Sequence, residues 1–354
     1  KRYTSIPRWK RTKAKKRKKN KTVNATLTEI AARIKAAKSA VILTHMRPDG
    51  DAFGSALGLS AALDRLGIPN TVCDESDIPS NLAFLEGTEK IQKQLPEAEL
   101  YIAVDSSDEQ RLGALAEPFR AAAKKHDTVN IDHHVSNTRF ARYDFVRLCS
   151  ANCMNILALV ETLGVPLDKK IAGYLLLGIL TDSGNFSHDD VTEETFLAAA
   201  KLTRAGADPA ALNYNLFRRQ PKARAELYAD ALGHIRWLLD DRFAVILLTL
   251  DKMKKYGADN GMTEGFVDFP LTVESVEVSA SVMEVKKGQY KISLRSKKYA
   301  DVNKIAGVYG GGGHVRAACC SASRKRSSTG CPTPFRSIFE RAAKGRRTEK
   351  GVKK

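Results

Sequence analysis

The sequence predicts two domains: an α/β domain with a parallel sheet covered by helices on both faces, then a smaller α+β domain. The chain has 354 residues, which is long enough for about two hydrophobic cores. Short apolar segments alternate with helix-like segments from about residue 24 to 205, the pattern of βαβ units. After about Gly206 strand-like segments dominate, and Lys287-Gly288 separates two of them as a hairpin turn would.

In the first domain, "AVILTH" (40–45) predicts a buried strand because it is short, apolar and β-branched. The apolar spacing from Ala52 to Leu66 predicts a helix that stops at Gly67. Two further strands are expected at "YIAVD" (101–105) and "TVNID" (128–132), and apolar helices at 152–163 and 169–180.

In the second domain, a connector and a long helix should precede strands at 242–250, 276–288 and 290–296. The expected organisation is a disordered basic tail (1–22), the first domain (23–205), a linker (206–222), the second domain (223–322) and a poorly ordered basic tail (323–354).

The formal charge of +18 is concentrated at the two ends of the chain. Residues 1–22 carry twelve Lys or Arg and no acid, and residues 323–354 carry a net charge of +9, which leaves −3 for residues 23–322. Such tails contact polyanions without sequence preference, through counterion release. An RNA-binding protein that works through these tails is therefore the non-enzymatic alternative.

The six cysteines form no C-x-x-C pair, which favours reduced thiols in a cytoplasmic protein. The longest apolar run, residues 171–180, is about half a membrane span, so no membrane partner is expected.

Metal-binding side chains follow four of the apolar segments. Because the carboxyl ends of parallel strands lie along one edge of a sheet, these side chains should meet in the crevice at the topological switch point. They are His45, Asp49 and Asp51 in "THMRPDGDAFGS", Asp105 after "YIAV", Asp132, His133 and His134 after "TVNI", and Asp182 in the loop "TDSGNFSH".

So many carboxylates in one place require cations, since each like-charge neighbour raises the pKa of the next. Two divalent ions, about 3.5–4 Å apart in typical sites, would neutralise them and activate water for hydrolysis. Mixed carboxylate and imidazole ligands favour Mn²⁺ over Mg²⁺ or Fe²⁺, and Zn²⁺ is less favoured still for want of thiolates.

The segments "HMRPDGDAFGS", "VDSSD", "NIDHH" and "GILTDSGNFSH" resemble the four successive motifs of the DHH phosphoesterases. The later stretch "SLRSKKYADVNKIAGVYGGGGHVRAA" is similar to the DHH-associated C-terminal domain. The resemblance covers roughly residues 24 to 320, and it is strongest to the bacterial bifunctional oligoribonucleases (nanoRNases) and pAp phosphatases.

This resemblance implies one Mn²⁺ on His45, Asp49 and Asp105, and a second on Asp51, Asp105, His133 and Asp182, with Asp105 shared. His134 would face the substrate and donate a proton to the leaving oxygen. Asp132 would orient the histidine pair from behind.

The second domain should bind the phosphate or nucleotide of the substrate. Glycines let a backbone approach an anion closely, and their N–H groups cradle phosphate. Arg295 offers a planar fork for phosphate oxygens. The expected substrate-binding residues are Arg295, Gly311, Gly312, Gly313 and His314, with the active site in the cleft between the domains.

The resemblance therefore implies a Mn²⁺-dependent, cytoplasmic exonuclease that hydrolyses short oligoribonucleotides to mononucleotides and removes the 3′-phosphate of pAp to give AMP. Homodimers are common among such proteins. Three alternatives use similar motifs: a cyclic-di-AMP or linear-dinucleotide phosphodiesterase, a family II inorganic pyrophosphatase and a RecJ-like exonuclease. The glycine-rich segment argues against the pyrophosphatase, and the short, acidic body argues against RecJ.

Overall fold

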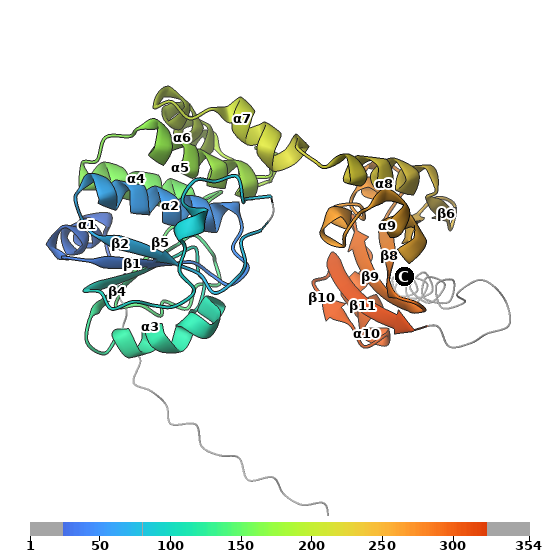
Figure 1. Ribbon diagram of the computed structural model, residues 1–354, viewed down its shortest axis with the longest axis horizontal. Coiled ribbons are helices and arrows are strands. Elements are labelled where there is room, and N and C mark those ends of the chain that lie inside the picture. The colour runs from blue at the N-terminus through green and yellow to red at the C-terminus, as the bar shows by residue number, and fades with distance from the viewer. Residues whose placement is uncertain (1–23, 80, 324–354) are drawn as a thin grey trace, which may run out of the picture. The chain divides into compact units, whose positions relative to one another are not determined.

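The computed structural model describes residues 24–79 and 81–323, and the chain divides into two units, Lys1–Arg219 and Gln220–Lys354. The two basic tails expected at 1–22 and 323–354 lie outside the described residues, apart from Ser323. Each unit has its own sheet and its own hydrophobic core, and each is described separately (Figure 1).

Unit 1 contains a five-stranded, fully parallel sheet in the order β2-β1-β3-β4-β5. Its strands are β1 (Ala40–Leu43), β2 (Asn70–Cys73), β3 (Leu100–Val104), β4 (Asp127–Asp132) and β5 (Tyr143–Val146). Its helices are α1 (Leu27–Ala36), α2 (Gly50–Arg65), α3 (Ala116–Ala122), α4 (Asn152–Leu163), α5 (Lys169–Asp182), α6 (Glu193–Arg204) and α7 (Pro209–Asn213), with 3-10 turns at Thr88–Lys90 and Glu109–Leu115 and a π-helical turn at Tyr214–Arg218.

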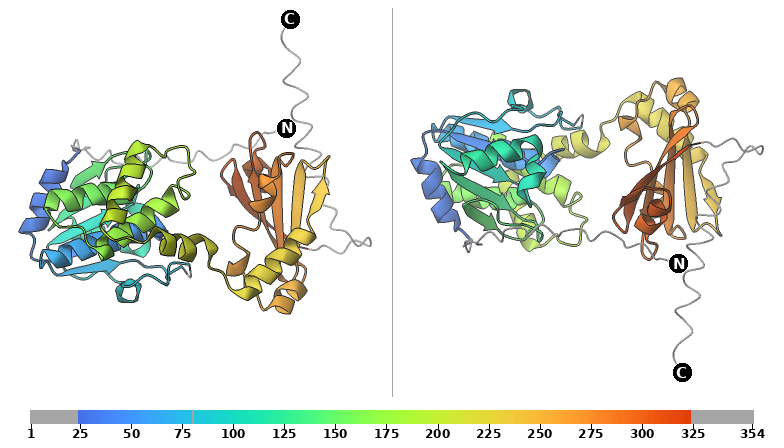
Figure 2. Two further views of the ribbon diagram at one scale, coloured as in Figure 1. Left: turned by 90° about the horizontal axis from the view of Figure 1, so that it is seen from above. Right: turned by 90° about the horizontal axis from the view of Figure 1, so that it is seen from below.

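Helices cover both faces of the sheet, as the fold prediction requires (Figures 1 and 2). The strands show why, because successive side chains of a strand point to opposite faces. In β1, Ile42 packs into the core shared with α1, α2, α4 and α5, whereas Val41 and Leu43 pack with Phe119 of α3 on the other face. Both faces of the sheet are therefore buried from solvent, which explains why the strands are apolar at every position.

The expected strands and helices of unit 1 are present, with ends that differ by one or two residues. One expectation was wrong: Asp182 is the last residue of α5 and does not lie in the following loop. The backbone helical hydrogen-bond pattern continues past Asp182, since the Ser183 amide donates to the Ile179 carbonyl at 3.1 Å.

Unit 2 is an α+β domain with a six-stranded mixed sheet in the order β10-β11-β9-β8-β7-β6. The predicted hairpin is confirmed, since β8 and β9 pair antiparallel around Lys287-Gly288. The strands are β6 (Arg236–Leu238), β7 (Phe243–Leu248), β8 (Val278–Lys286), β9 (Gln289–Ser296), β10 (Gly312–Gly313) and β11 (Ala317–Ser323). The helices are α8 (Lys222–Gly233), α9 (Leu250–Tyr256) and α10 (Val302–Val308), with 3-10 turns at Gly261–Thr263 and Phe269–Thr272.

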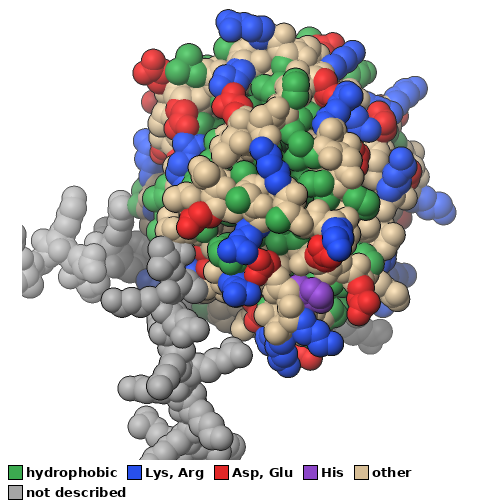
Figure 3. All heavy atoms as spheres, turned by 90° about the vertical axis from the view of Figure 1, so that its left-hand side faces the viewer, with side chains coloured by type: hydrophobic (Ala, Val, Ile, Leu, Met, Phe, Trp, Pro, Cys, Tyr) green, Lys and Arg blue, Asp and Glu red, His purple; other side chains and the backbone are tan. Residues whose placement is uncertain are grey.

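The described surface carries charges of both signs. On the face drawn in Figure 3, Lys and Arg side chains lie interspersed with Asp and Glu. Within the described ranges, no helix is both long and apolar enough to cross a bilayer. The five cysteines described there, Cys73, Cys149, Cys153, Cys319 and Cys320, are free thiols.

Candidate metal and active site

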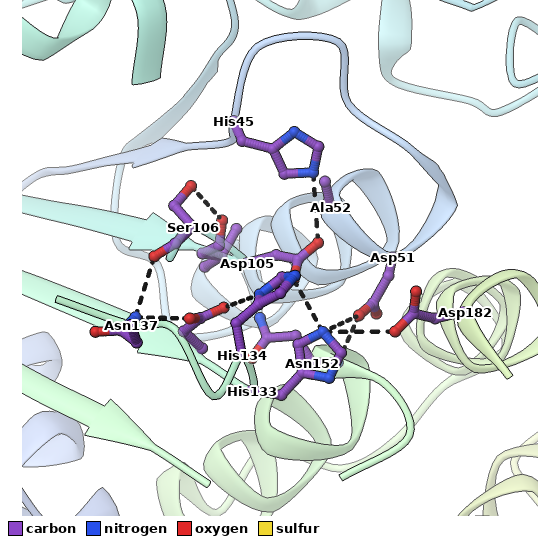
Figure 4. A network of polar contacts seen from close by, with 12 residues as sticks. His45, Asp51, Ala52, Asp105, Ser106, His133, His134, Asn137, Asn152 and Asp182 are labelled. Carbon is purple, nitrogen blue, oxygen red and sulfur yellow. Dashed lines mark hydrogen bonds and ion pairs between the residues drawn. The ribbon is translucent and has the colours of Figure 1, made fainter. Parts of the chain in front are cut away.

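The candidate site lies at the switch point of the unit 1 sheet. Strand β1 has β2 on one side and β3 on the other, so the connections that leave β1 and β3 diverge and open a crevice at their carboxyl ends. His45 follows β1 by two residues and Asp105 follows β3 directly. The two side chains meet there, with His45 Nε2 3.7 Å from Asp105 Oδ2 (Figure 4).

One cluster combines His45, Asp49 and Asp105, whose ligand atoms lie within 4.8 Å of one another. Asp49 is the N-cap of α2: its Oδ1 accepts the amide N–H groups of Asp51 and Ala52 at 3.1 and 3.0 Å. This cap fixes the carboxylate. The other oxygen, Oδ2, is left 4.0 Å from His45 Nε2.

A second cluster combines Asp51, His133 and Asp182, again within 4.8 Å. His133 Nε2 lies 3.4 Å from Asp182 Oδ2, 3.9 Å from Asp51 Oδ2 and 3.4 Å from Asp105 Oδ1, so Asp105 faces both clusters (Figure 4). The buried Asp51 carboxylate accepts the first two amides of α4, from Asn152 and, at 2.9 Å, from Cys153. The positive end of that helix stabilises the carboxylate.

Two histidines are oriented by backbone carbonyls. Nδ1 of His45 lies 3.0 Å from the Met46 carbonyl oxygen, and Nδ1 of His133 lies 2.8 Å from that of Cys149. A carbonyl can only accept, so Nδ1 carries the proton in each ring and donates it. Nε2 then faces the carboxylates in each ring and is the nitrogen left to bind a metal ion once it has lost its proton.

The third histidine is held differently. His134 donates from Nδ1 to Oδ1 of Asp132 at 2.8 Å, and Asp132 itself is fully buried. Hydrogen bonding to Asp132 raises the pKa of His134, against the opposing effect of burial. About a third of the His134 side chain remains exposed, so this ring, unlike those of His45 and His133, is accessible from outside.

The acids of the cluster compete for protons when no cation is bound. Burial, reinforced by the charges of Asp105 and Asp182, raises the pKa of Asp51 well above its ordinary value. Burial likewise raises the pKa of Asp182 to about 6. Burial alone would lower the pKa of His133, but Asp105 and Asp51 outweigh it and raise the pKa to about 10. Cations would replace these protons.

The donor set fits divalent metal ions. Oδ1 of Asp105 is buried without a hydrogen-bond partner among the described residues, and it lies 3.4 Å from His133 Nε2. Such an atom is costly unless a ligand satisfies it. Two ligand atoms that bind the same ion, each at about 2.1 Å, lie about 3–4 Å from one another. The imidazole and carboxylate atoms of this site have such separations. Asp105 also has φ +54°, a strained left-handed conformation typical of functional positions.

The predicted residues of unit 2 also lie together, within their own unit. Ala317 of β11 pairs with Arg295 of β9, and the Ala317 carbonyl accepts the His314 amide at 2.7 Å. Glycine is required in this turn: a Cβ on Gly311 would lie 2.1 Å from the Cys319 carbonyl oxygen, and one on Gly313 would lie 2.5 Å from that of Ala317. His314 is exposed, and Arg295 Nε lies 3.3 Å from Asp268 Oδ1.

The groups that hold the candidate ligands in place could not be recognised from the sequence. The amides of Asn152 and Cys153 and the carbonyls of Met46 and Cys149 are backbone groups, and no residue type marks them. Asn137 was also missed; its side-chain amide donates to Asp132 Oδ2 at 2.6 Å. Its one signal in the sequence is an amide side chain in the loop that carries His133 and His134.

Two family models and several known proteins match this chain. The family model "DHH family, N-terminal domain" matches residues 39–179, and the "DHHA1 domain" model matches residues 241–327. A bifunctional oligoribonuclease and PAP phosphatase NrnA from Thermus thermophilus is 34% identical over 282 residues, which cover 78% of this chain and 82% of that protein.

The chain belongs to the DHH family.

Two further relatives extend the match. A probable bifunctional oligoribonuclease and PAP phosphatase NrnA from Streptococcus mutans is 27% identical, over 82% of this DHH chain and 91% of that protein. The crystal structure of an exopolyphosphatase-related protein from Bacteroides fragilis is 25% identical, with a TM-score of 0.76 over 90% of this chain and 95% of that one. The predicted family and fold class are thus confirmed.

Proposed function

We propose that this DHH protein is a metal-dependent phosphoesterase that hydrolyses short oligoribonucleotides to mononucleotides and removes the 3′-phosphate of pAp to give AMP. The observation that carries the proposal is the pair of carboxylate–imidazole clusters at the switch point, with Asp105 in one cluster and its Oδ1 3.4 Å from His133 Nε2 of the other. The names of the Thermus thermophilus and Streptococcus mutans relatives support both activities.

In this proposal the clusters hold two divalent ions, most favourably Mn²⁺. His45, Asp49 and Asp105 would bind one ion, and Asp51, Asp105, His133 and Asp182 the other. Bound there, the ions would supply Lewis acidity and activated water.

The chain itself supplies proton transfer and orientation. His134 is the most accessible of the three imidazoles at the site, and its Nδ1 donates to Asp132. Its Nε2 would therefore protonate the leaving oxygen of the substrate. Asp132, which cannot reach solvent, holds the ring in that orientation.

Unit 2 would recognise the substrate. Gly311, Gly312 and Gly313 with His314 form a tight turn beside Arg295, and this turn would hold the phosphate or terminal nucleotide of a short substrate. Arg295 would pair with phosphate oxygens in place of Asp268.

The test compares hydrolysis of pAp, pApA, cyclic-di-AMP and pyrophosphate by the full chain with Mn²⁺. Asp105→Asn keeps the shape of the side chain but removes its charge, and turnover should fall by more than the 10–100-fold that is roughly typical of an outer-shell partner. Asp144→Asn is the matched control, because Asp144 is also fully buried in the same sheet but lies outside the clusters.

Turnover of both pAp and pApA by the wild type and the control, but not by Asp105→Asn, supports the proposal. Turnover of pyrophosphate or cyclic-di-AMP alone would retain the metal site and refute the substrates. Wild-type turnover in Asp105→Asn would refute the site itself.

A further inference from the structure

The side chain of Asn137 joins the two loops that carry the candidate catalytic residues. It lies in the loop after β4, three residues beyond His134, where Figure 4 shows it next to Ser106, and its Nδ2 is within hydrogen-bond distance of three oxygens. These are Asp132 Oδ2 at 2.6 Å, Asn130 Oδ1 at 2.8 Å and the Ser106 carbonyl at 3.2 Å.

Asn137 completes the hydrogen bonding of the Asp132 carboxylate. Oδ1 of Asp132 accepts from His134, and Oδ2 accepts from Asn137. Because Asp132 is fully buried, no solvent can replace either donor. With both oxygens held, the carboxylate plane is fixed, and so is the imidazole that donates to it. Without Asn137, Oδ2 would be a buried, unpaired anionic oxygen free to rotate.

The Asn137 side-chain amide also hydrogen-bonds to the loop after β3. Ser106, whose carbonyl accepts from Asn137, directly follows Asp105 with its left-handed φ of +54°. Asn130, on β4, donates to that carbonyl as well, at 3.1 Å. The Ser106 carbonyl therefore has a second side-chain donor besides Asn137. Asp132 Oδ2, in contrast, accepts a side-chain hydrogen bond from Asn137 alone among the described residues.

The geometry points to Asn137 as a positioning residue: its side-chain N–H fixes Asp132 and, through Asp132, the orientation of the His134 ring. This inference rests on the proposed function, because it assigns a role in the same hydrolysis. Asn137 is not a catalytic residue, since it acts on His134 only through Asp132.

A purely structural role is the competing explanation. Oδ1 of Asn137 accepts the Arg139 amide at 2.7 Å, which is an Asx turn that shapes the loop, and Arg139 has a left-handed φ of +54°. Asn137→Asp keeps this acceptor but removes the N–H donor and places a second carboxylate against Asp132. Asn137→Ala removes both interactions. The two variants therefore separate a turn-forming role from a positioning role.

The experiment measures kcat and KM for pAp with Mn²⁺ for the wild type, Asn137→Ala, Asn137→Asp, Asp132→Asn and the double variant Asp132→Asn/Asn137→Ala. We expect kcat to fall about 10–100-fold in both Asn137 variants, the range for outer-shell partners. KM and the Mn²⁺ concentration for half-maximal activity should stay within about threefold, because neither substrate nor metal contacts change.

The double variant tests the route of the effect. If Asn137 acts through Asp132, adding Asn137→Ala to Asp132→Asn should lower kcat no further, within about twofold. Asn70→Ala is the matched control: its Nδ2 also has three oxygen acceptors, Asp64 Oδ1, the Ile68 carbonyl and the Ser60 carbonyl, but it lies at the amino end of β2, away from the site. Its kcat should equal that of the wild type.

Three outcomes would overturn the inference: full activity in Asn137→Asp with loss in Asn137→Ala, multiplicative losses in the double variant, or equal losses in Asn70→Ala. A wild type that hydrolyses none of the substrates would instead refute the proposed function, so the two failures are distinguishable.

Discussion

Two glycines of α5 should respond to alanine in opposite directions. A Cβ on Gly178 would lie 2.3 Å from Cys153 Sγ, 2.6 Å from Asp51 Oδ1 and 3.0 Å from the Asp51 Cα. A Cβ on Gly173, one and a half turns earlier in the same helix, meets no atom within 4 Å. Gly178 is therefore a point of close approach between α5, α2 and α4. At Gly173, in contrast, there is open space for a methyl group.

The magnitudes follow from packing and helix propensity. Overpacking a core costs about 1–3 kcal/mol, and the two contacts below 3.0 Å put Gly178→Ala at the upper end. Alanine regains about 1 kcal/mol of helix propensity, so the net loss should be about 2 kcal/mol. Gly173→Ala has only the gain in helix propensity and should stabilise the protein by about 1 kcal/mol. At about 2–4 °C per kcal/mol, Tm should fall by about 4–8 °C in the first variant and rise by about 2–4 °C in the second.

Differential scanning calorimetry of the full chain measures both variants. Gly178→Ala should also raise the Mn²⁺ concentration needed for half-maximal activity, because the new methyl group would displace the Asp51 carboxylate. A Gly178→Ala protein as stable as the wild type would refute this account of the helix packing. A Gly173→Ala protein that loses stability would contradict the assignment of open space at that position.

Two predictions concern cations and protons. Removing divalent ions with a chelator and adding Mn²⁺ back should raise Tm, since ions at 100 times their Kd stabilise the folded state by about 2.7 kcal/mol; an unchanged Tm in calorimetry would contradict a metal site. Burial raises the pKa of Asp144 to about 6, so the folded state holds this proton more tightly than the unfolded chain. Stability from this group is present at low pH and is lost as pH rises from about 4 through 6. Asp144→Asn should therefore raise Tm at pH 8 and not at pH 4, and the same shift at both pH values would contradict it.

The sequence by itself determined the fold class and the residues that meet at the site. Continuous apolar strands such as 101–105 could be recognised because a sheet buried on both faces needs apolar side chains at every position. His45, Asp105 and Asp132 stand where apolar segments stop, so the carboxyl ends of β1, β3 and β4 could be located to within one or two residues.

The tertiary structure decided how those side chains are oriented. Asp51 is held by the amides of Asn152 and Cys153, about a hundred residues further along the chain, and His133 by the Cys149 carbonyl. Backbone N–H and C=O groups are the same at almost every residue, so no pattern in the sequence marks the ones that a fold will use. The role of Asn137 depends in the same way on which oxygens the folded loops bring to one amide.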